Sequence, residues 1–303
     1  MANKVMIVGT GNVGMSYGYA LVNQRTAVNE LILVDVNQED AEGEAMDLRD
    51  ALAVAPSYLK IKSGTTADAG DCDIIVITAG VPQQPGESRM ELLKKNAAIF
   101  KTMVQQIMDS GFDGIFVVVT NPMDVMTHLV WQYSGLPTER IIGSGTVLDS
   151  ARLRQQLAKR LGVHSRSVHA YQVGEHGDSE FALWSSAFVG CQKITELIDA
   201  EELSRIEDLA RKEAYAIIEK KGATYYGIGA CLATITHCIL SDENRVLPVS
   251  NFDELSGTFN GFPAVLGRQG IQRRLGPQLS SDEQQKFEAS IAVIKQAIAE
   301  ASS

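Results

Sequence analysis

Short apolar runs alternate with longer segments of mixed polarity in the first half of the chain. The apolar runs are rich in Val and Ile, and we expect them to be buried parallel strands: Val5–Val8, Leu31–Val34, Ile74–Ile77, Ile115–Val119 and Arg140–Ile142. Most of the segments between them have the pattern of helices, among them Asn12–Gln24, Gln38–Leu52 and Met90–Asp109. This alternation predicts an α/β fold in which helices cover both faces of a parallel sheet.

The pattern changes after Gly143. Longer helices are expected in the second half, with a hairpin-like stretch and two further strands between them. The helices are Val147–Leu161, Ala200–Lys221, Ala223–Leu240 and Ser281–Ala299, the hairpin-like stretch is Val168–Phe188, and the strands are Val246–Val249 and Ala264–Leu266. We therefore predict an N-terminal domain at residues 1–143 and an α+β substrate domain at residues 144–303, packed tightly together because no flexible linker separates them.

Composition and charge exclude several classes of protein. Hydrophobic residues make up 45% of the 303 positions, which is enough for a large core. The net charge of −10 argues against a nucleic-acid partner, because phosphate binding needs clustered Lys and Arg. We expect no signal peptide, because the first residues already read as a strand, and no stretch reaches the roughly 18 apolar residues of a membrane span. Four scattered cysteines without a CxxC pair indicate reduced thiols, so we expect a cytoplasmic enzyme.

A glycine motif follows the first expected strand. Gly9, Gly11 and Gly14 form GxGxxG at the start of the next helix, where a tight turn lets free N–H groups approach a pyrophosphate. Asp35 ends the second strand about 20 residues further on, where a carboxylate accepts the ribose hydroxyls and repels a 2′-phosphate. The alternative is a helix-packing turn with a capping Asp. We interpret the pair as a Rossmann-type site for NAD rather than NADP.

A histidine in a glycine-flanked loop is the candidate acid. His176 lies in the sequence GEHGD, and histidine is the usual general acid near neutral pH. Asp149 could hold its imidazole in the correct tautomer, although the spacing does not reveal that pairing. Arg152 follows on nearly the same helix face and could bind a substrate carboxylate through its planar fork. By spacing alone, the favoured alternative for Asp149 and Arg152 is an ion pair on the helix surface.

A stretch rich in Gly and Pro, residues 79–89, is typical of a mobile lid. Arg89 lies where this stretch meets the next helix and could polarise a carbonyl group, the alternative being a structural loop with a helix-terminal Arg. The five histidines lack the spacing of zinc ligands, so we expect no metal site.

Together these segments resemble one family. GTGNVG, AGVPQQPGESR, VTNPMDV, GSGTVLDSARLR, VHAYQVGEHGDSE and KKGATYYGIG occur in the order found in the L-lactate/malate dehydrogenase family, and most resemble its bacterial L-lactate dehydrogenases. The resemblance covers essentially the whole chain. It implies reversible, NADH-dependent reduction of pyruvate to L-lactate by a cytoplasmic homotetramer.

The resemblance also implies roles for individual residues. His176 is the expected proton donor, Asp149 orients it, and Arg89 polarises the carbonyl group of the substrate. The substrate would be bound by Gln83, Arg89, Asn121, Arg152 and Thr224, and NAD would be bound by Gly9, Gly11, Val13, Gly14, Asp35, Gly80 and Asn121.

Gln83 bears on which 2-hydroxy acid is used. Malate dehydrogenases carry Arg at the matching lid position, and a neutral Gln would leave the second carboxylate of oxaloacetate without a partner. This favours pyruvate, although bulkier 2-keto acids, as in a hydroxyisocaproate-type enzyme, stay open because Gln84 and Pro85 could shape a roomier pocket. A non-catalytic NAD-binding regulator would be expected to lack His176, Asp149 or an Arg.

Two further residues resemble a regulatory feature. Arg154 and His169 match positions through which many bacterial lactate dehydrogenases bind fructose 1,6-bisphosphate across a subunit interface. The alternative is a surface Arg and a partly buried strand His. The segments Gly190–Leu203 and Asn251–Gly261 are shorter than in relatives, which leaves details of assembly open.

Overall fold

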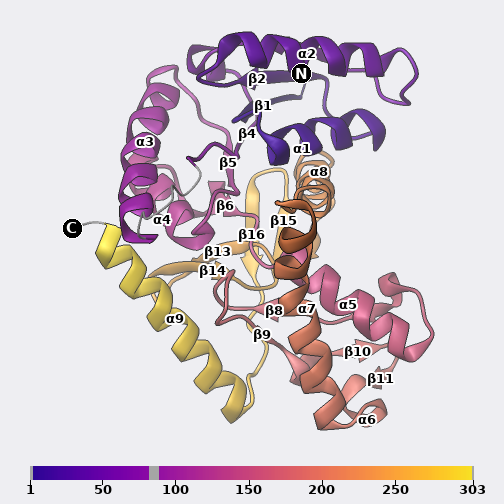
Figure 1. Cartoon of the computed structure of the whole chain (residues 1–303). Coiled ribbons are helices and arrows are strands. Elements are labelled where there is room, and N and C mark those ends of the chain that lie inside the picture. The colour runs from indigo at the N-terminus through magenta and orange to yellow at the C-terminus, as the bar shows by residue number, and fades with distance from the viewer. Residues whose placement is uncertain (1–2, 82–88, 302–303) are drawn as a thin grey trace.

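The computed structural model describes residues 3–81 and 89–301, and for Arg89 it describes the backbone only. Within these residues the largest sheet has eight strands, in the order β14-β13-β6-β5-β4-β1-β2-β3 (Figure 1). Its parallel part consists of β1 (Lys4–Val8), β2 (Glu30–Val34), β3 (Lys60–Ser63), β4 (Ile74–Ile77), β5 (Ile115–Val118) and β6 (Ile141–Gly143). The predicted Rossmann-type doubly wound sheet is confirmed. β3 was not expected, because this edge strand carries a single buried apolar residue, Ile61.

Alternate residues of the central strand enter two separate cores. Val5 and Ile7 pack in a core with helices α1 (Asn12–Asn23) and α2 (Gln38–Leu52). Met6 and Val8 pack on the other face, in the core of helices α3 (Arg89–Asp109) and α4 (Met123–Ser134). Burial on both faces explains why these strands read as continuous apolar runs.

The second half of the chain contributes a hairpin to the same sheet. Strands β13 (Ser250–Asp253) and β14 (Thr258–Gly261) pair antiparallel with each other, and β13 continues the sheet beside β6. The sequence of this hairpin does not predict strands, because Asn and Asp are depleted in strands. Its Asn251 is nevertheless buried, and its side-chain amide donates hydrogen bonds to the carbonyl oxygens of Val249 and Phe262. The domain boundary after residue 143 stays a prediction.

The remaining elements form the α+β part expected from the sequence. Its helices are α5 (Val147–Leu161), α6 (Ile194–Leu197), α7 (Ala200–Lys221), α8 (Tyr226–Leu240) and α9 (Ser281–Ala301). Its small sheets contain β7 (Val168–His169), β8 (Gln172–Val173), β9 (Phe181–Ala182), β10 (Phe188–Val189), β11 (Gln192–Lys193), β12 (Arg245–Leu247), β15 (Ala264–Gly267) and β16 (Gly270–Arg274). Pairing of β7 with β10 and of β8 with β9 accounts for the predicted hairpin-like stretch.

Two predicted boundaries were wrong. Of the strand expected over Val246–Val249, only Val246 and Leu247 lie in a strand, β12. Pro248 has no N–H to donate to a ladder, and the next strand, β13, begins at Ser250. Helix α8 begins at Tyr226 rather than Ala223, because the preceding residues form a loop in which Thr224 lines a cavity.

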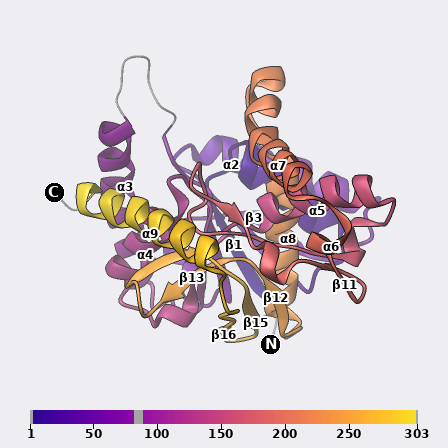
Figure 2. The same ribbon diagram turned by 90° about the horizontal axis from the view of Figure 1, so that it is seen from below.

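Helices from the two halves of the chain pack against each other. Helix α8 shares the core of α1, where the Tyr17 hydroxyl and Thr236 Oγ1 are hydrogen-bonded at 2.6 Å. Helix α9 lies alongside α3 and α4, as seen from below in Figure 2, and its Ala297 and Ile298 pack on their core. Among the described helices, none combines the length and the apolar character needed to cross a membrane.

Candidate active site

The three motif glycines meet different steric demands. Gly9 has a φ of +105°, and a Cβ there would lie 2.5 Å from the backbone nitrogen of Ala79. A Cβ on Gly14 would lie 2.0 Å from the carbonyl oxygen of Gly9, so this position allows the turn to pack on the helix. Gly11, which caps α1, faces open space, since a Cβ added there would meet no described atom within 4 Å. A phosphate can therefore approach the free N–H groups of this helix end.

The Asp35 carboxylate lies beside this turn. Its Oδ2 accepts hydrogen bonds from the backbone N–H of Thr10 at 2.8 Å and from Thr10 Oγ1 at 3.1 Å. Its Oδ1 accepts the backbone N–H of Asn37 at 3.1 Å. Partial burial disfavours the charge of Asp35, but these hydrogen bonds outweigh burial and lower the pKa of its carboxyl. An ionised carboxylate at this place fits a ribose with free hydroxyls.

A cavity of about 420 Å³ opens next to the turn. Gly9, Asp35 and Gly80 line it, together with the apolar side chains of Ile99 and Met103 from α3. Polar groups at one side and an apolar wall at the other suit an adenosine. Gly9 of the GxGxxG turn and Asp35 thus line one cavity, as the binding of NAD there would require.

A second cavity, of about 290 Å³, gathers six of the predicted site residues. They come from separate elements: the start of α1, the loop between β5 and α4, helix α5, the loop before β9 and the loop between α7 and α8. The six are Val13, Asn121, Asp149, Arg152, His176 and Thr224. Val13 belongs to the same GxGxxG motif as Gly9: Gly9 lines the first cavity and Val13 lines the second, so one short segment of the chain borders both cavities.

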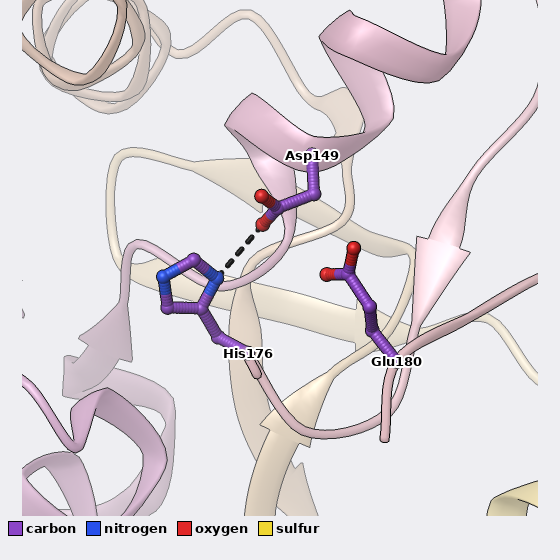
Figure 3. Close-up of side chains that lie close together, drawn as sticks. All are labelled: Asp149, His176 and Glu180. Carbon is purple, nitrogen blue, oxygen red and sulfur yellow. Dashed lines mark hydrogen bonds and ion pairs between the residues drawn. The ribbon is translucent and has the colours of Figure 1, made fainter. Parts of the chain in front are cut away.

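His176 and Asp149 are hydrogen-bonded in this second cavity (Figure 3). The distance from His176 Nδ1 to Asp149 Oδ2 is 2.8 Å, which leaves Nε2 of the imidazole available to a ligand. Burial disfavours the imidazolium, but the charge of Asp149 and its hydrogen bond outweigh burial and raise the pKa of His176 to about 9. The imidazole is therefore protonated at neutral pH and able to donate a proton.

Asp149 also accepts a hydrogen bond from Arg152, with a distance of 2.9 Å from Nη1 of Arg152 to Oδ1 of Asp149. Both side chains are only 7% exposed, so the interpretation of an ion pair on the helix surface was wrong. Burial disfavours the charge of Asp149, yet His176 and Arg152 together hold the pKa of its carboxyl below the usual value. The pair lies in the cavity because α5 turns this face inward, with Leu153 and Leu157 fully buried beside it.

A third carboxylate supports the loop of His176. Asp124, in the first turn of α4, is buried and accepts the backbone N–H of His176 at 2.7 Å and the hydroxyl of Ser250. Burial raises the pKa of Asp124 to about 6, and these hydrogen bonds oppose that rise. Asp124 was not among the predicted site residues, although it lies in the VTNPMDV motif three positions after Asn121.

Other functional candidates were also missed. Glu180 lies four positions after His176, and both it and Arg211 of α7 line the second cavity. Tyr215 of α7 lines it too and donates a hydrogen bond from its hydroxyl to Asp178 Oδ1 at 2.6 Å, which ties the helix to the His176 loop. The sequence signal for these α7 residues is only their spacing on one helix face, which does not distinguish a core face from a site.

Some predicted residues lie elsewhere. Gln83 and the side chain of Arg89 are outside the described residues. Arg154 is half-buried on α5, where its Nε donates to the carbonyl oxygen of Ser150 at 3.3 Å. His169 is exposed on β7, so the alternative of a partly buried strand histidine was wrong for this chain taken alone.

Together, the doubly wound sheet, the dinucleotide turn and the buried His–Asp–Arg group define a nicotinamide-dependent dehydrogenase. Comparison with known proteins gives the family. Residues 3–143 match the lactate/malate dehydrogenase NAD binding domain, and residues 146–303 match the lactate/malate dehydrogenase alpha/beta C-terminal domain. The chain therefore belongs to the lactate/malate dehydrogenase family and is an NAD-dependent oxidoreductase, as the motifs predicted.

Within the family the chain groups with L-lactate dehydrogenases. It is 50% identical to L-lactate dehydrogenase 2 of Bacillus cereus and 50% identical to L-lactate dehydrogenase 1 of Bacillus anthracis, in each case over 98% of both chains. A crystal structure of a lactate dehydrogenase from a Medee basin deep-sea metagenome library superposes with a TM-score of 0.97 at 46% identity, covering 100% of both chains. Minor L-lactate dehydrogenase from Enterococcus mundtii, in its ligands-bound form, gives 0.95 at 43% identity over 98% of both chains.

Proposed function

We propose that this chain reduces pyruvate to L-lactate with NADH, and catalyses the reverse reaction, in the cavity that holds His176, Asp149 and Arg152. The observation that supports this most directly is the buried group itself: an imidazole hydrogen-bonded to a carboxylate, which is in turn bonded to a guanidinium. NADH, when bound, supplies the hydride. The protein must then bind the substrate's carboxylate and deliver one proton to its carbonyl oxygen.

Each role follows from the charge and position of a residue. Arg152 has donors left beyond its bond to Asp149, and these can pair with the carboxylate of pyruvate. His176, protonated at neutral pH, donates the proton to the oxygen that becomes the lactate hydroxyl and is left as a neutral imidazole. Asp149 holds Nδ1 during this step, so that the proton leaves from Nε2. Asn121 and Thr224 line the same cavity as further substrate contacts, and Arg89 is the proposed polarising group.

Substrate preference is tested by comparing pyruvate, oxaloacetate and 2-ketoisocaproate as oxidants of NADH. Pyruvate should give the highest kcat/KM. A higher value with 2-ketoisocaproate would instead make the chain a hydroxyisocaproate-type enzyme, and a higher value with oxaloacetate would make it a malate dehydrogenase. Absence of turnover with all three, despite NADH binding, would support a non-catalytic role.

Gln83→Arg should shift preference from pyruvate towards oxaloacetate. The new cation would pair with the second carboxylate of oxaloacetate, a charge-assisted bond of roughly 1.5–3 kcal/mol, and would be left unpaired over the methyl group of pyruvate. We therefore expect the ratio of the two kcat/KM values to change by about 10²-fold, at 1.4 kcal/mol per factor of ten. Rates should be measured well below saturation at low salt. A change under about threefold would mean that Gln83 does not face the substrate.

We also propose a homotetrameric, cytoplasmic enzyme that binds fructose 1,6-bisphosphate through Arg154 and His169. Arg154 is half-buried and His169 is exposed, and a guanidinium and an imidazole can both donate hydrogen bonds to a phosphate. A second subunit could bring a matching pair to the same phosphates. The phosphate ligand would then stabilise the assembly, because it would bind across an interface.

Sedimentation should show four subunits, and bisphosphate should strengthen the assembly and raise affinity for pyruvate. Arg154→Gln should abolish the response to bisphosphate while activity without bisphosphate is retained, because Arg154 lies outside the described substrate cavity. Arg166→Gln, an exposed arginine nearby in the chain, is the matched control and should respond normally. A fully active monomer would contradict the assembly, and an Arg154→Gln variant that still responds would contradict the regulatory site.

A further inference from the structure

Glu180 is a buried carboxylate in the acid–base site that the mechanism above does not use. We propose that Glu180 is a positioning residue that acts through His176: together with Asp149, its negative charge stabilises the protonated imidazole before proton transfer. The inference rests on the proposed role of His176 as proton donor. It assigns a second carboxylate to the reaction: Asp149 precedes His176 in the sequence, and Glu180 follows it.

Geometry brings the three groups together. One oxygen of Glu180, one oxygen of Asp149 and one ring nitrogen of His176 all lie within 4.8 Å of one another. Figure 3 shows the Glu180 carboxylate turned towards Asp149 and the imidazole. Glu180 is only 4% exposed, and its backbone is fixed where the loop enters β9, whose Phe181 is buried in a core with Val173.

The contacts of Glu180 indicate that it acts through charge. In the described part of the chain no hydrogen bond is donated to its carboxylate, whereas Asp149 is bonded to both His176 and Arg152. A carboxylate buried without such a bond is costly to ionise unless a nearby cation compensates its charge, and the ring of His176 lies close enough to be that cation. Glu180 also lines the cavity, where water is displaced when a substrate binds.

The surrounding charges determine when Glu180 is ionised. Burial raises the pKa of Glu180 strongly and Asp149 raises it further, while His176, Arg211 and Arg152 lower it. The imidazolium and the Glu180 carboxylate therefore stabilise each other: when His176 loses its proton, Glu180 becomes easier to protonate. The charged groups that face this cluster are Asp149 and Arg152 from α5, Asp124 from α4, Arg211 from α7, and Glu175 and Asp178 from the loop.

The test is the pH dependence of kcat/KM for pyruvate in Glu180→Gln. Removing the charge without changing the shape should move the alkaline limb of the profile to lower pH by about one to two units, the effect of one carboxylate at this distance from an imidazole. Lactate oxidation, which needs neutral His176, should begin at correspondingly lower pH. Glu180→Asp keeps the charge and should retain most of the alkaline activity.

A second readout does not require turnover. Diethyl pyrocarbonate acylates neutral imidazole, so the pH at which His176 reacts at half its maximal rate, followed by peptide mass spectrometry, reports its protonation. This pH should fall by the same amount in Glu180→Gln and in the smaller neutral variant Glu180→Ser. Glu219→Gln, an exposed carboxylate of α7, is the matched control and should change neither profile.

The outcomes separate this inference from the proposed function. Unchanged kinetic and acylation profiles in both neutral variants would overturn the role of Glu180, whatever their activity. Should His176→Ala retain activity with pyruvate while the acylation profile still shifts, the proposed proton donor would be wrong, and the electrostatic coupling between Glu180 and His176 would stand by itself.

Discussion

His176→Ala should lower kcat/KM for pyruvate by at least about 10²-fold, the lower end of what general acid–base catalysis contributes. Alanine removes the imidazole that is placed to donate a proton from its hydrogen bond with Asp149, and the substitution leaves Asp149 paired with Arg152. NADH binding, followed by its fluorescence, should stay nearly unchanged, because the GxGxxG turn and Asp35 make none of their described contacts with His176.

A matched control is His237→Ala. His237 lies in the last turn of α8, is 40% exposed at its side chain, and does not line the described substrate cavity. Its removal should leave kcat/KM within about twofold, as expected for a surface substitution. If His176→Ala keeps more than about a tenth of the activity, another group delivers the proton and the role given to His176 is wrong.

The parallel sheet could be predicted because its strands are buried on both faces. Val5 to Val8 are apolar at every position, so neither the strand nor its parallel pairing depended on recognising an alternation. The β13–β14 hairpin could not be predicted in the same way. Its buried Asn251 and Asn260 are stabilised by partners distant in sequence, above all the guanidinium of Arg274, which donates to the side-chain oxygens of both.

Only some residues of the site could be predicted, and the reason is similar. A glycine turn followed by an acidic strand end is a local signal, and both parts lie where the sequence indicated. The pairing of His176 with Asp149 spans 27 positions, and only the fold brings them together. Asp124 and Glu180 gave no usable local signal, since an acidic residue in the first turn of a helix or after a loop usually caps or faces solvent.

Burial also decided the interpretation of Arg152. Spacing of three along a helix suits a surface ion pair, which contributes little to stability. The same pair inside a cavity is different, because the desolvated Asp149 and an incoming substrate carboxylate both need the guanidinium. In the proposed function Arg152 connects substrate binding to the His176–Asp149 pair, so we expect its removal to lower activity strongly.

Arg152→Gln should lower kcat/KM for pyruvate by about 10²–10³-fold, mainly through a higher KM. The substitution removes a buried cation from a carboxylate, a loss of about 2–5 kcal/mol, part of which reflects the partner left unpaired. Arg152→Lys keeps the charge but not the planar fork, so it should recover only part of the loss. The matched control is Arg160→Gln. Arg160 lies on the exposed part of the same helix, with its Nε 3.6 Å from Oε1 of Glu202, and its substitution should change kcat/KM by less than about threefold.

Methyl pyruvate separates substrate binding from support of Asp149. Its ester group has no charge for Arg152 to pair with, so Arg152→Gln should lower kcat/KM for the ester far less than for pyruvate. The two losses would be equal if Arg152 acted only by holding Asp149, because proton transfer from His176 is the same for both substrates. If Arg152→Gln lowers kcat/KM for pyruvate by a factor about 10-fold or more larger than for the methyl ester, Arg152 is the group that binds the carboxylate. Equal losses would reduce Arg152 to a support of the His176–Asp149 pair, and another cation would have to bind pyruvate.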